Sequence, residues 1–163
     1  MIWLNLVVLL IIAGLIYLES QRGFGRALFD VIGGLLTVIL GGKLAEALAG
    51  SVHLLASEGS NQALWYFFVF LAGAALTVWA GKIIHETTLI SLDVLDPAGG
   101  AVLGVAVGIL VSHVFLAILT LAAGGTEFAE AIKRSFCTQE FYYFRSYHNA
   151  LDVLRHIGEW EPE

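Results

Sequence analysis

Charged residues are so unevenly spaced along this chain that their distribution constrains the fold more than any other feature. Four long stretches are almost free of Asp, Glu, Lys and Arg: residues 2–18, 27–50, 63–81 and 97–125. A helix needs about 20 apolar residues to cross the hydrocarbon core of a bilayer, with a usable range of about 17–25. We therefore predict four transmembrane helices, at about residues 2–18, 27–49, 63–84 and 98–123.

The composition agrees with this prediction and opposes a soluble domain. Hydrophobic residues make up 58% of the 163-residue chain, and charged residues make up 13%, whereas about 25% is typical of soluble domains. No ten-residue segments of alternating hydrophobicity recur, so a transmembrane barrel is set aside. The predicted fold class is an all-α membrane protein, with a four-helix transmembrane domain in residues 1–125 and an amphipathic helical tail in residues 126–163.

The first apolar stretch has a second interpretation, a cleaved signal peptide. A signal peptide carries a basic segment ahead of its apolar core and small residues at its cleavage site. Nothing basic precedes Arg22, and residues 16–20 (Ile-Tyr-Leu-Glu-Ser) make a poor cleavage site. The stretch is therefore predicted to remain as a helix.

The predicted connections between the four helices are short: residues 19–26, 51–62 and 82–96. In the second connection, residues 57–61 (Ser-Glu-Gly-Ser-Asn) have a turn-like composition. Pro97 suits the first turn of the fourth helix, where its missing N–H costs nothing.

The tail is patterned rather than disordered. Its apolar residues recur at helical spacing in two groups: Phe128, Ile132 and Phe136, and then Phe144, Tyr147, Leu151 and Leu154. We expect two amphipathic helices that lie on the bilayer or against the loops. The alternative is a small soluble cap packed on itself, because amphipathicity does not distinguish lipid from protein.

Small residues recur at every fourth position in three of the helices. The most regular set lies in the fourth helix, and two looser sets lie in the third and second: Gly100, Gly104, Gly108 and Ser112; Gly73, Thr77 and Gly81; Gly34, Thr37, Gly41 and Ala45. Since lipid supplies little hydrophobic drive between helices, close backbone approach over small residues must provide the packing energy. These faces predict one tight bundle, and the alternatives are a pore lining or a seam between copies of the chain.

Ionisable residues at membrane depth are functional candidates by default. His113 lies near the middle of the fourth helix, where the simpler interpretation is a neutral imidazole bonded to a neighbouring helix. Asp30 follows Arg26 by four residues, which predicts an ion pair near the interface. Two further pairs of opposite charge have helical spacing: Lys43 with Glu46, and Lys82 with Glu86. Ion pairing, or snorkelling of the side chains toward the interface, accounts for them without a functional role.

Several function classes lack their motifs. Residues 85–89 (His-Glu-Thr-Thr-Leu) begin like a metalloprotease motif but lack its second histidine. No nucleophile turn or phosphate loop is present, and a lone Cys137 excludes a cysteine-pair zinc motif. A net charge of −6 with eight Lys and Arg argues against nucleic-acid binding. We expect no catalytic, cofactor or metal site, and the lipid bilayer as the first partner.

Two motifs carry a family resemblance. Residues 22–26 (Arg-Gly-Phe-Gly-Arg) open the second helix, and residues 95–104 (Leu-Asp-Pro-Ala-Gly-Gly-Ala-Val-Leu-Gly) open the fourth. Around four helices of this size and order, they resemble the colicin V production (CvpA) family over about residues 1–125. The residue after the aspartate is often basic in that family, whereas here it is Pro97.

The resemblance implies a multi-pass protein of the bacterial inner membrane that acts in colicin V production or export, or in envelope maintenance, without established catalysis. Its partners would be envelope or export proteins, and a homo-oligomer is a further expectation. The residues expected to meet a partner are those of the two motifs: Arg22, Gly23, Phe24, Arg26 and Asp96. They also have simpler roles, since arginines anchor at headgroups and Asp96 suits the cap of the fourth helix. The competing function is a small oligomeric channel or transporter subunit with His113 lining a polar path.

The orientation in the membrane is predicted from basic residues. Those near the membrane tie at three on each side: Lys43, Lys133 and Arg134 against Arg22, Arg26 and Lys82. The loop that borders the first helix usually dominates. We therefore predict that Arg22 and Arg26 are cytoplasmic and that both termini lie outside.

Overall fold

The structure is a computed structural model that describes residues 2–88 and 96–158, with the side chains of residues 2–83 and 96–152. Its helices, in chain order, are α1 (Ile2–Arg22), α2 (Phe24–Ser51), α3 (Glu58–Thr88), α4 (Asp96–Ala123), α5 (Glu127–Lys133), α6 (Phe136–Phe141) and α7 (Arg145–Gly158). The first four are long and apolar enough to cross a membrane, which confirms the four predicted spans. Pro97 lies in the first turn of α4, as predicted.

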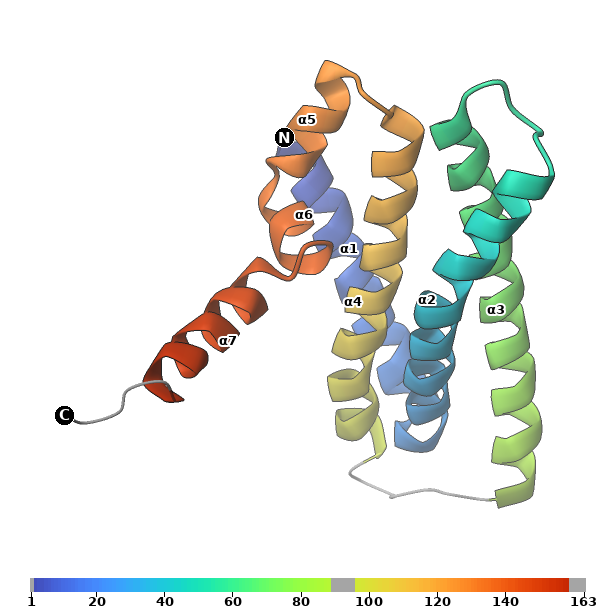
Figure 1. The fold of residues 1–163 in the computed structure, drawn as a ribbon. Coiled ribbons are helices and arrows are strands. Elements are labelled where there is room, and N and C mark those ends of the chain that lie inside the picture. Colours follow the sequence, from blue (N-terminus) through green and yellow to red (C-terminus); the bar gives the residue numbers. More distant parts are fainter. Residues whose placement is uncertain (1, 89–95, 159–163) are drawn as a thin grey trace.

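The long helices lie side by side in the order α1, α4, α2, α3 (Figure 1). α4 occupies the centre and packs against the other three. Successive long helices run in opposite directions, so α1 begins and α4 ends at the same end of the bundle, which we call the tail end. At the opposite end α1 meets α2 and α4 begins, and we call this the corner end.

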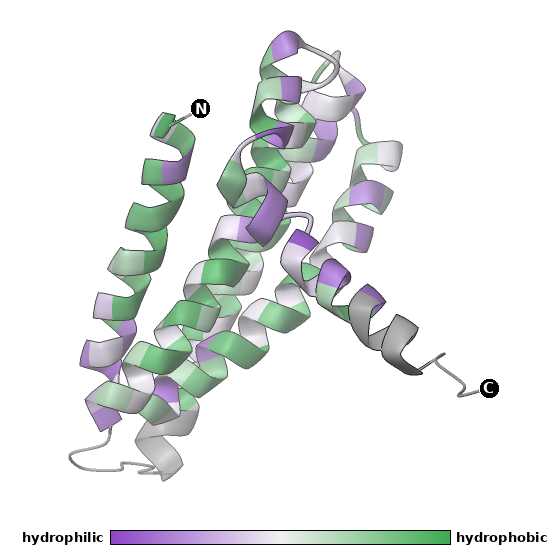
Figure 2. Cartoon of the chain, turned by 90° about the vertical axis from the view of Figure 1, so that its left-hand side faces the viewer, coloured by the Kyte–Doolittle hydropathy of each residue, from purple (hydrophilic) through white to green (hydrophobic). Residues whose placement is uncertain are grey.

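The outer surface of the bundle is apolar, as a lipid-facing surface must be. Hydrophobic residues colour most of the length of the long helices, and hydrophilic ones gather at the helix ends and in the tail (Figure 2). Many large side chains that point outward are exposed, among them Leu10, Ile39, Leu76 and Trp79. An exposed apolar surface of this extent marks contact with a membrane or with other proteins.

The connection between α1 and α2 is much shorter than predicted. Residues 19–26 were expected to form a loop, but α1 continues to Arg22 and α2 begins at Phe24, leaving Gly23 alone between them. Gly23 has φ 85°, in the left-handed region that favours glycine. One residue therefore reverses the chain, and Glu19, Arg22 and Arg26 become helical residues at the corner end.

The connection between α2 and α3 is also shorter than predicted, because residues 58–61 belong to α3 and not to a turn. Asn61 is buried, and its amide organises the loop from inside the helix. Its Nδ2 donates to the Ala49 and Val52 carbonyls at 3.1 Å, and its Oδ1 accepts from Leu54 N at 2.8 Å. A polar residue that suggested a turn in the sequence thus holds the turn from the neighbouring helix.

The tail forms three helices instead of the expected two. The spacing of Phe128, Ile132 and Phe136 suggested one helix, but α5 ends at Lys133 and α6 begins at Phe136. Ser135 breaks the pattern, because its hydroxyl accepts a hydrogen bond from Thr138 N and caps α6. α5 and α6 pack on α1 and α4, whereas α7 leaves the bundle and contacts α6 (Figure 1).

The contact between the tail and the bundle is apolar and specific. Leu4 and Val8 of α1, Leu116 of α4 and Ile132 of α5 form a buried cluster at the tail end. Cys137 N donates to Asn5 Oδ1 at 3.1 Å, which joins α6 to α1. The Trp3 and Phe128 rings stack nearby with their centroids 6.4 Å apart. Neither helices against the loops nor a cap packed on itself describes this arrangement, because α5 and α6 pack on the sides of two membrane helices; whether the tail also lies on the bilayer stays a prediction.

Candidate functional site

The two sequence motifs, far apart in the chain, meet at the corner end. Asp96, the first residue of α4, accepts a hydrogen bond from Phe24 N at 2.7 Å. A side chain at Gly23 would collide with the Asp96 carboxylate, and one at Gly99 would meet the Phe24 ring at 2.8 Å. Gly23 and Gly99 therefore allow the Asp96 carboxylate to sit directly on the start of α2.

This contact corrects the role expected of Asp96. The sequence suggested that Asp96 caps its own helix, but its hydrogen bond caps α2, which has no side-chain cap from Gly23. The first N–H groups of a helix have no partner within the helix and carry partial positive charge. A carboxylate from α4 therefore satisfies one of them and ties α4 to α2.

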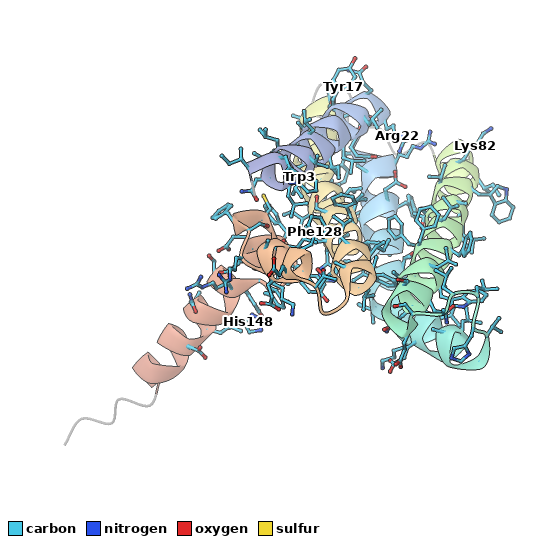
Figure 3. All side chains as sticks on the ribbon, turned by 90° about the horizontal axis from the view of Figure 1, so that it is seen from above. Trp3, Tyr17, Arg22, Lys82, Phe128 and His148 are labelled. Carbon is cyan, nitrogen blue, oxygen red and sulfur yellow. The ribbon has the colours of Figure 1, made fainter. Side chains whose placement is uncertain are left out.

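Arg22 forms the charged part of the corner. Its Nη1 donates to Glu19 Oε1 at 3.0 Å and to Asp30 Oδ2 at 3.2 Å, so one nitrogen serves two carboxylates. Figure 3, which looks down the bundle, places Arg22 near the start of α2, whereas Tyr17 and Lys82 lie at its periphery. The predicted pair between Arg26 and Asp30 is wrong, because Asp30 pairs with Arg22 across the Gly23 reversal.

Three buried polar atoms of this region have no hydrogen-bond partner among the described residues: Glu19 Oε2, Asp30 Oδ1 and Arg26 Nε. Glu19 was not singled out in the sequence, although it precedes Arg22 by three residues. It is 1% exposed because glycines of α4 pack on it. Its spacing to Arg22 is visible in the sequence, but its burial follows from the approach of α4.

A cavity of about 150 Å³ begins at these carboxylates and runs into the bundle. Glu19, Arg22 and Asp30 are the titratable residues among those that line it. Farther along, its walls carry the Thr37 and Thr77 side chains and apolar residues of α3 and α4. The corner is thus the inner wall of a pocket within the transmembrane bundle.

The glycine ridge of α4 packs on the backbone of α1, a contact that we call the α1–α4 seam. A Cβ at Gly104 would lie 2.8 Å from Ile16 Cα, and one at Gly108 would lie 3.0 Å from Ile12 Cα. A Cβ at Gly100 would collide with the Glu19 carbonyl oxygen. Ser112 continues the ridge and is fully buried. In this chain, therefore, the ridge faces another helix of the same bundle.

A second close contact, the α2–α3 seam, pairs glycine with threonine. A Cβ at Gly33 would collide with Thr77, and a Cβ at Gly73 would collide with Thr37. Each threonine hydroxyl donates to the glycine carbonyl one turn earlier on its own helix, at 2.7 Å for Thr37 and 2.9 Å for Thr77. The spacing of small residues predicted Gly73 correctly, but on α2 it indicated Gly34 instead of Gly33. Gly34 instead faces Leu110 of α4, and Gly81 approaches Phe29 of α2.

His113 lies toward the tail end, away from the corner. Its Nδ1 is 3.1 Å from the Phe141 carbonyl oxygen, and its ring lies against Tyr142 and Phe144, with centroids 5.3 and 5.6 Å away. The simpler sequence interpretation expected a bond to a neighbouring helix, and the partner is the last residue of α6. His113 also lines a cavity of about 190 Å³ with Gln62, Tyr66 and Tyr142.

The remaining predicted pairs contribute less. Lys43 and Glu46 are exposed, and no ion pair joins them in the described part of the chain. The expected partner of Lys82, Glu86, lies outside the described side chains, as does His85. No group of His, Cys, Asp and Glu residues among the described positions could hold a metal ion.

Three titratable groups of α5 and α6 have a pKa that is shifted by a hydrogen bond or by burial. A hydrogen bond to Lys133 lowers the pKa of Glu130, and the same bond raises the pKa of Lys133. Burial raises the pKa of the Cys137 thiol. The tail therefore carries a surface ion pair and a protonated, buried thiol.

Together, four membrane-spanning helices, a corner that joins two distant motifs and a tail packed on the bundle define a small multi-pass membrane protein. The family model described as "Colicin V production protein" matches residues 4–143, which cover α1 from its third residue onward and all of α2–α6. The chain belongs to the colicin V production family. A search of curated proteins and a search of solved structures each found no match to it.

Proposed function

We propose that this chain is a non-enzymatic protein of the bacterial inner membrane that takes part in the production or export of a bacteriocin, or in envelope maintenance. The observation that carries the proposal is the family match over residues 4–143, which includes both corner motifs and the tail helices that pack on the bundle. In the described residues, Asp96 joins α4 to α2 and Arg22 joins α1 to α2.

The way the bundle is built supports a scaffold role over a chemical one. Asp96 is engaged by Phe24 N, and Arg22 is engaged by two carboxylates. The surface offered to a partner is the apolar exterior of the bundle together with α7, whose described side chains are exposed. Such a protein would act by holding envelope or export proteins in the plane of the membrane.

The test is complementation in a bacterium that secretes a peptide bacteriocin and lacks its own family member. Restored toxin secretion, measured by growth inhibition of a sensitive strain while intracellular toxin falls, supports export. Restored resistance to bile salts with unchanged secretion supports envelope maintenance. Failure to restore either phenotype, with the protein accumulating in the inner membrane, contradicts the proposal. Gly104→Leu and Val105→Leu serve as a destabilised variant and its matched control.

A channel subunit is the second candidate function, and the cavity beside His113 favours it. The cavity at the corner meets α4 at Val107, Leu110 and Val111, and the cavity beside His113 meets the next turns of the same helix, so ionisable side chains lie in both. Purified protein in liposomes would then conduct a selective ion flux that His113→Leu abolishes. Absence of flux at protein densities that give channel activity in a control would exclude this function.

A further inference from the structure

The cavity at the corner end holds an unbalanced set of buried charges. Glu19 is 1% exposed and Asp30 is 8% exposed, and both share Nη1 of Arg22. With both carboxylates ionised, these three side chains carry one net negative charge. An uncompensated charge in the interior of a membrane protein is costly, so it persists only with a partner.

The other residues around the cavity do not supply that partner. Among the described lining residues, those of α3 and α4 are uncharged, and α2 contributes only Asp30 as a titratable group. Arg26 lies one turn before Asp30 but does not line the cavity or pair with it. Asp96 of α4 is acidic and is engaged by Phe24 N.

The unused oxygens indicate where the compensating charge belongs. Each carboxylate uses one oxygen for Arg22, and its second oxygen is buried without a partner, Oε2 in Glu19 and Oδ1 in Asp30. A metal cation would need several oxygen ligands at once. Besides the two carboxylates, the described lining side chains offer only the Thr37 and Thr77 hydroxyl oxygens, and the rest of the lining outside Arg22 is apolar. One proton needs only one of the two free oxygens.

We propose that the Glu19–Asp30 pair is a proton-binding site inside the transmembrane bundle, holding one proton between its two carboxylates while Arg22 balances the remaining charge. On binding, a hydronium ion gives up its proton to form one O–H bond at a free carboxylate oxygen and leaves as water. A cavity of about 150 Å³ has room for several water molecules that deliver it. This inference does not depend on the proposed role in toxin export.

The test is infrared spectroscopy of the purified full chain in a detergent that contains no ester or carboxyl group, at neutral pH. Exposed carboxylates are ionised under these conditions, so the C=O stretch of a protonated acid reports a buried site. We expect one such band, shifted in D₂O, in the wild-type protein. Its absence overturns the proposal, and this result needs no variant to fold.

Two nearly isosteric variants then assign the band. In either Glu19→Gln or Asp30→Asn, the remaining carboxylate is paired one-to-one with Arg22, so the acid band should disappear from both. Glu46→Gln, an exposed acid on α2, is the matched control and should leave it unchanged. A band that survives either corner substitution overturns the shared proton. A band that vanishes when the potassium salt of the buffer is replaced by a sodium salt also overturns it, because the site would then bind a metal cation.

Discussion

The two seams of the bundle achieve close helix packing in different ways. In the α1–α4 seam, glycines of α4 lie against main-chain atoms of α1. In the α2–α3 seam, each glycine lies against a threonine side chain of the other helix. A side chain can rotate or be replaced, but a main chain can yield only if the whole helix moves. The neighbours of the α4 glycines therefore constrain them more strictly than the threonines constrain the glycines of α2 and α3.

The seams also differ in how they are closed. At the corner end of the α1–α4 seam, Asp96 of α4 accepts a hydrogen bond from Phe24 N of α2, and at the tail end Cys137 N of α6 donates to Asn5 Oδ1 of α1. The α2–α3 seam borders a wide apolar groove of about 780 Å³ that includes Gly33, Gly73 and several leucines. The α2–α3 seam is therefore open to lipid chains along this groove, whereas hydrogen bonds lie at both ends of the α1–α4 seam.

The largest expected effect is a bulky residue in the α1–α4 seam. Gly104→Leu forces α1 away from α4, whereas Val105→Leu places the same side chain at a position that is 40% exposed. Overpacking typically costs about 1–3 kcal/mol. We expect Gly104→Leu to lose at least that much free energy of unfolding in detergent and to accumulate poorly in the membrane. Equal behaviour of the two variants would mean that the ridge faces lipid.

A smaller effect is expected where Asp96 closes this seam. Asp96→Ala leaves Phe24 N without its acceptor, and loss of a helix cap costs about 0.5–2 kcal/mol. Thermal unfolding in detergent should show this loss, and Asp96→Asn, which keeps an oxygen acceptor, should recover part of it. If Asp96→Ala unfolds at the wild-type temperature, the contact between α4 and α2 has no energetic role.

At the tail end of the α1–α4 seam, the packing of α6 on α1 can be tested by labelling the wild-type protein. Burial raises the pKa of Cys137, so less thiolate is present at any given pH than in a free cysteine, and the thiol is 2% exposed. We expect almost no maleimide labelling of the folded protein at neutral pH and full labelling after unfolding in SDS. In a Cys137→Ala background, Phe136→Cys should label readily, since position 136 is exposed. Rapid labelling of native Cys137 would show that α6 is not packed on α1.

The predicted orientation stays a prediction that a reporter can decide. A C-terminal alkaline phosphatase fusion should be active if both termini lie outside, and a fusion at the corner end should not. The reverse pattern would place Arg22 and Arg26 outside the cytoplasm.

Local properties of the sequence predicted the spans and the regular ridge, because span length and residue size are set residue by residue. Contacts between helices of the bundle were harder to predict from the sequence. Arg26 and Asp30 have ideal helical spacing, yet Arg22 takes Asp30 because Gly23 reverses the chain. Asp96 and Asn61 were assigned to their own helix start and turn, whereas their hydrogen bonds serve other segments. Such partners depend on how helices meet, which spacing within one helix does not contain.

Two double-mutant cycles on the free energy of unfolding test whether the glycines of α4 pack on main chain while those of α2 and α3 pack on side chains. Thr37→Ala removes atoms that an alanine at position 73 would strike, so Gly73→Ala and Thr37→Ala should compensate each other by about 1 kcal/mol. Ile16→Ala leaves Ile16 Cα in place, so it should not relieve Gly104→Ala, and that interaction energy should be near zero. Equal interaction energies in the two cycles would show that the two seams do not differ in what their glycines pack against.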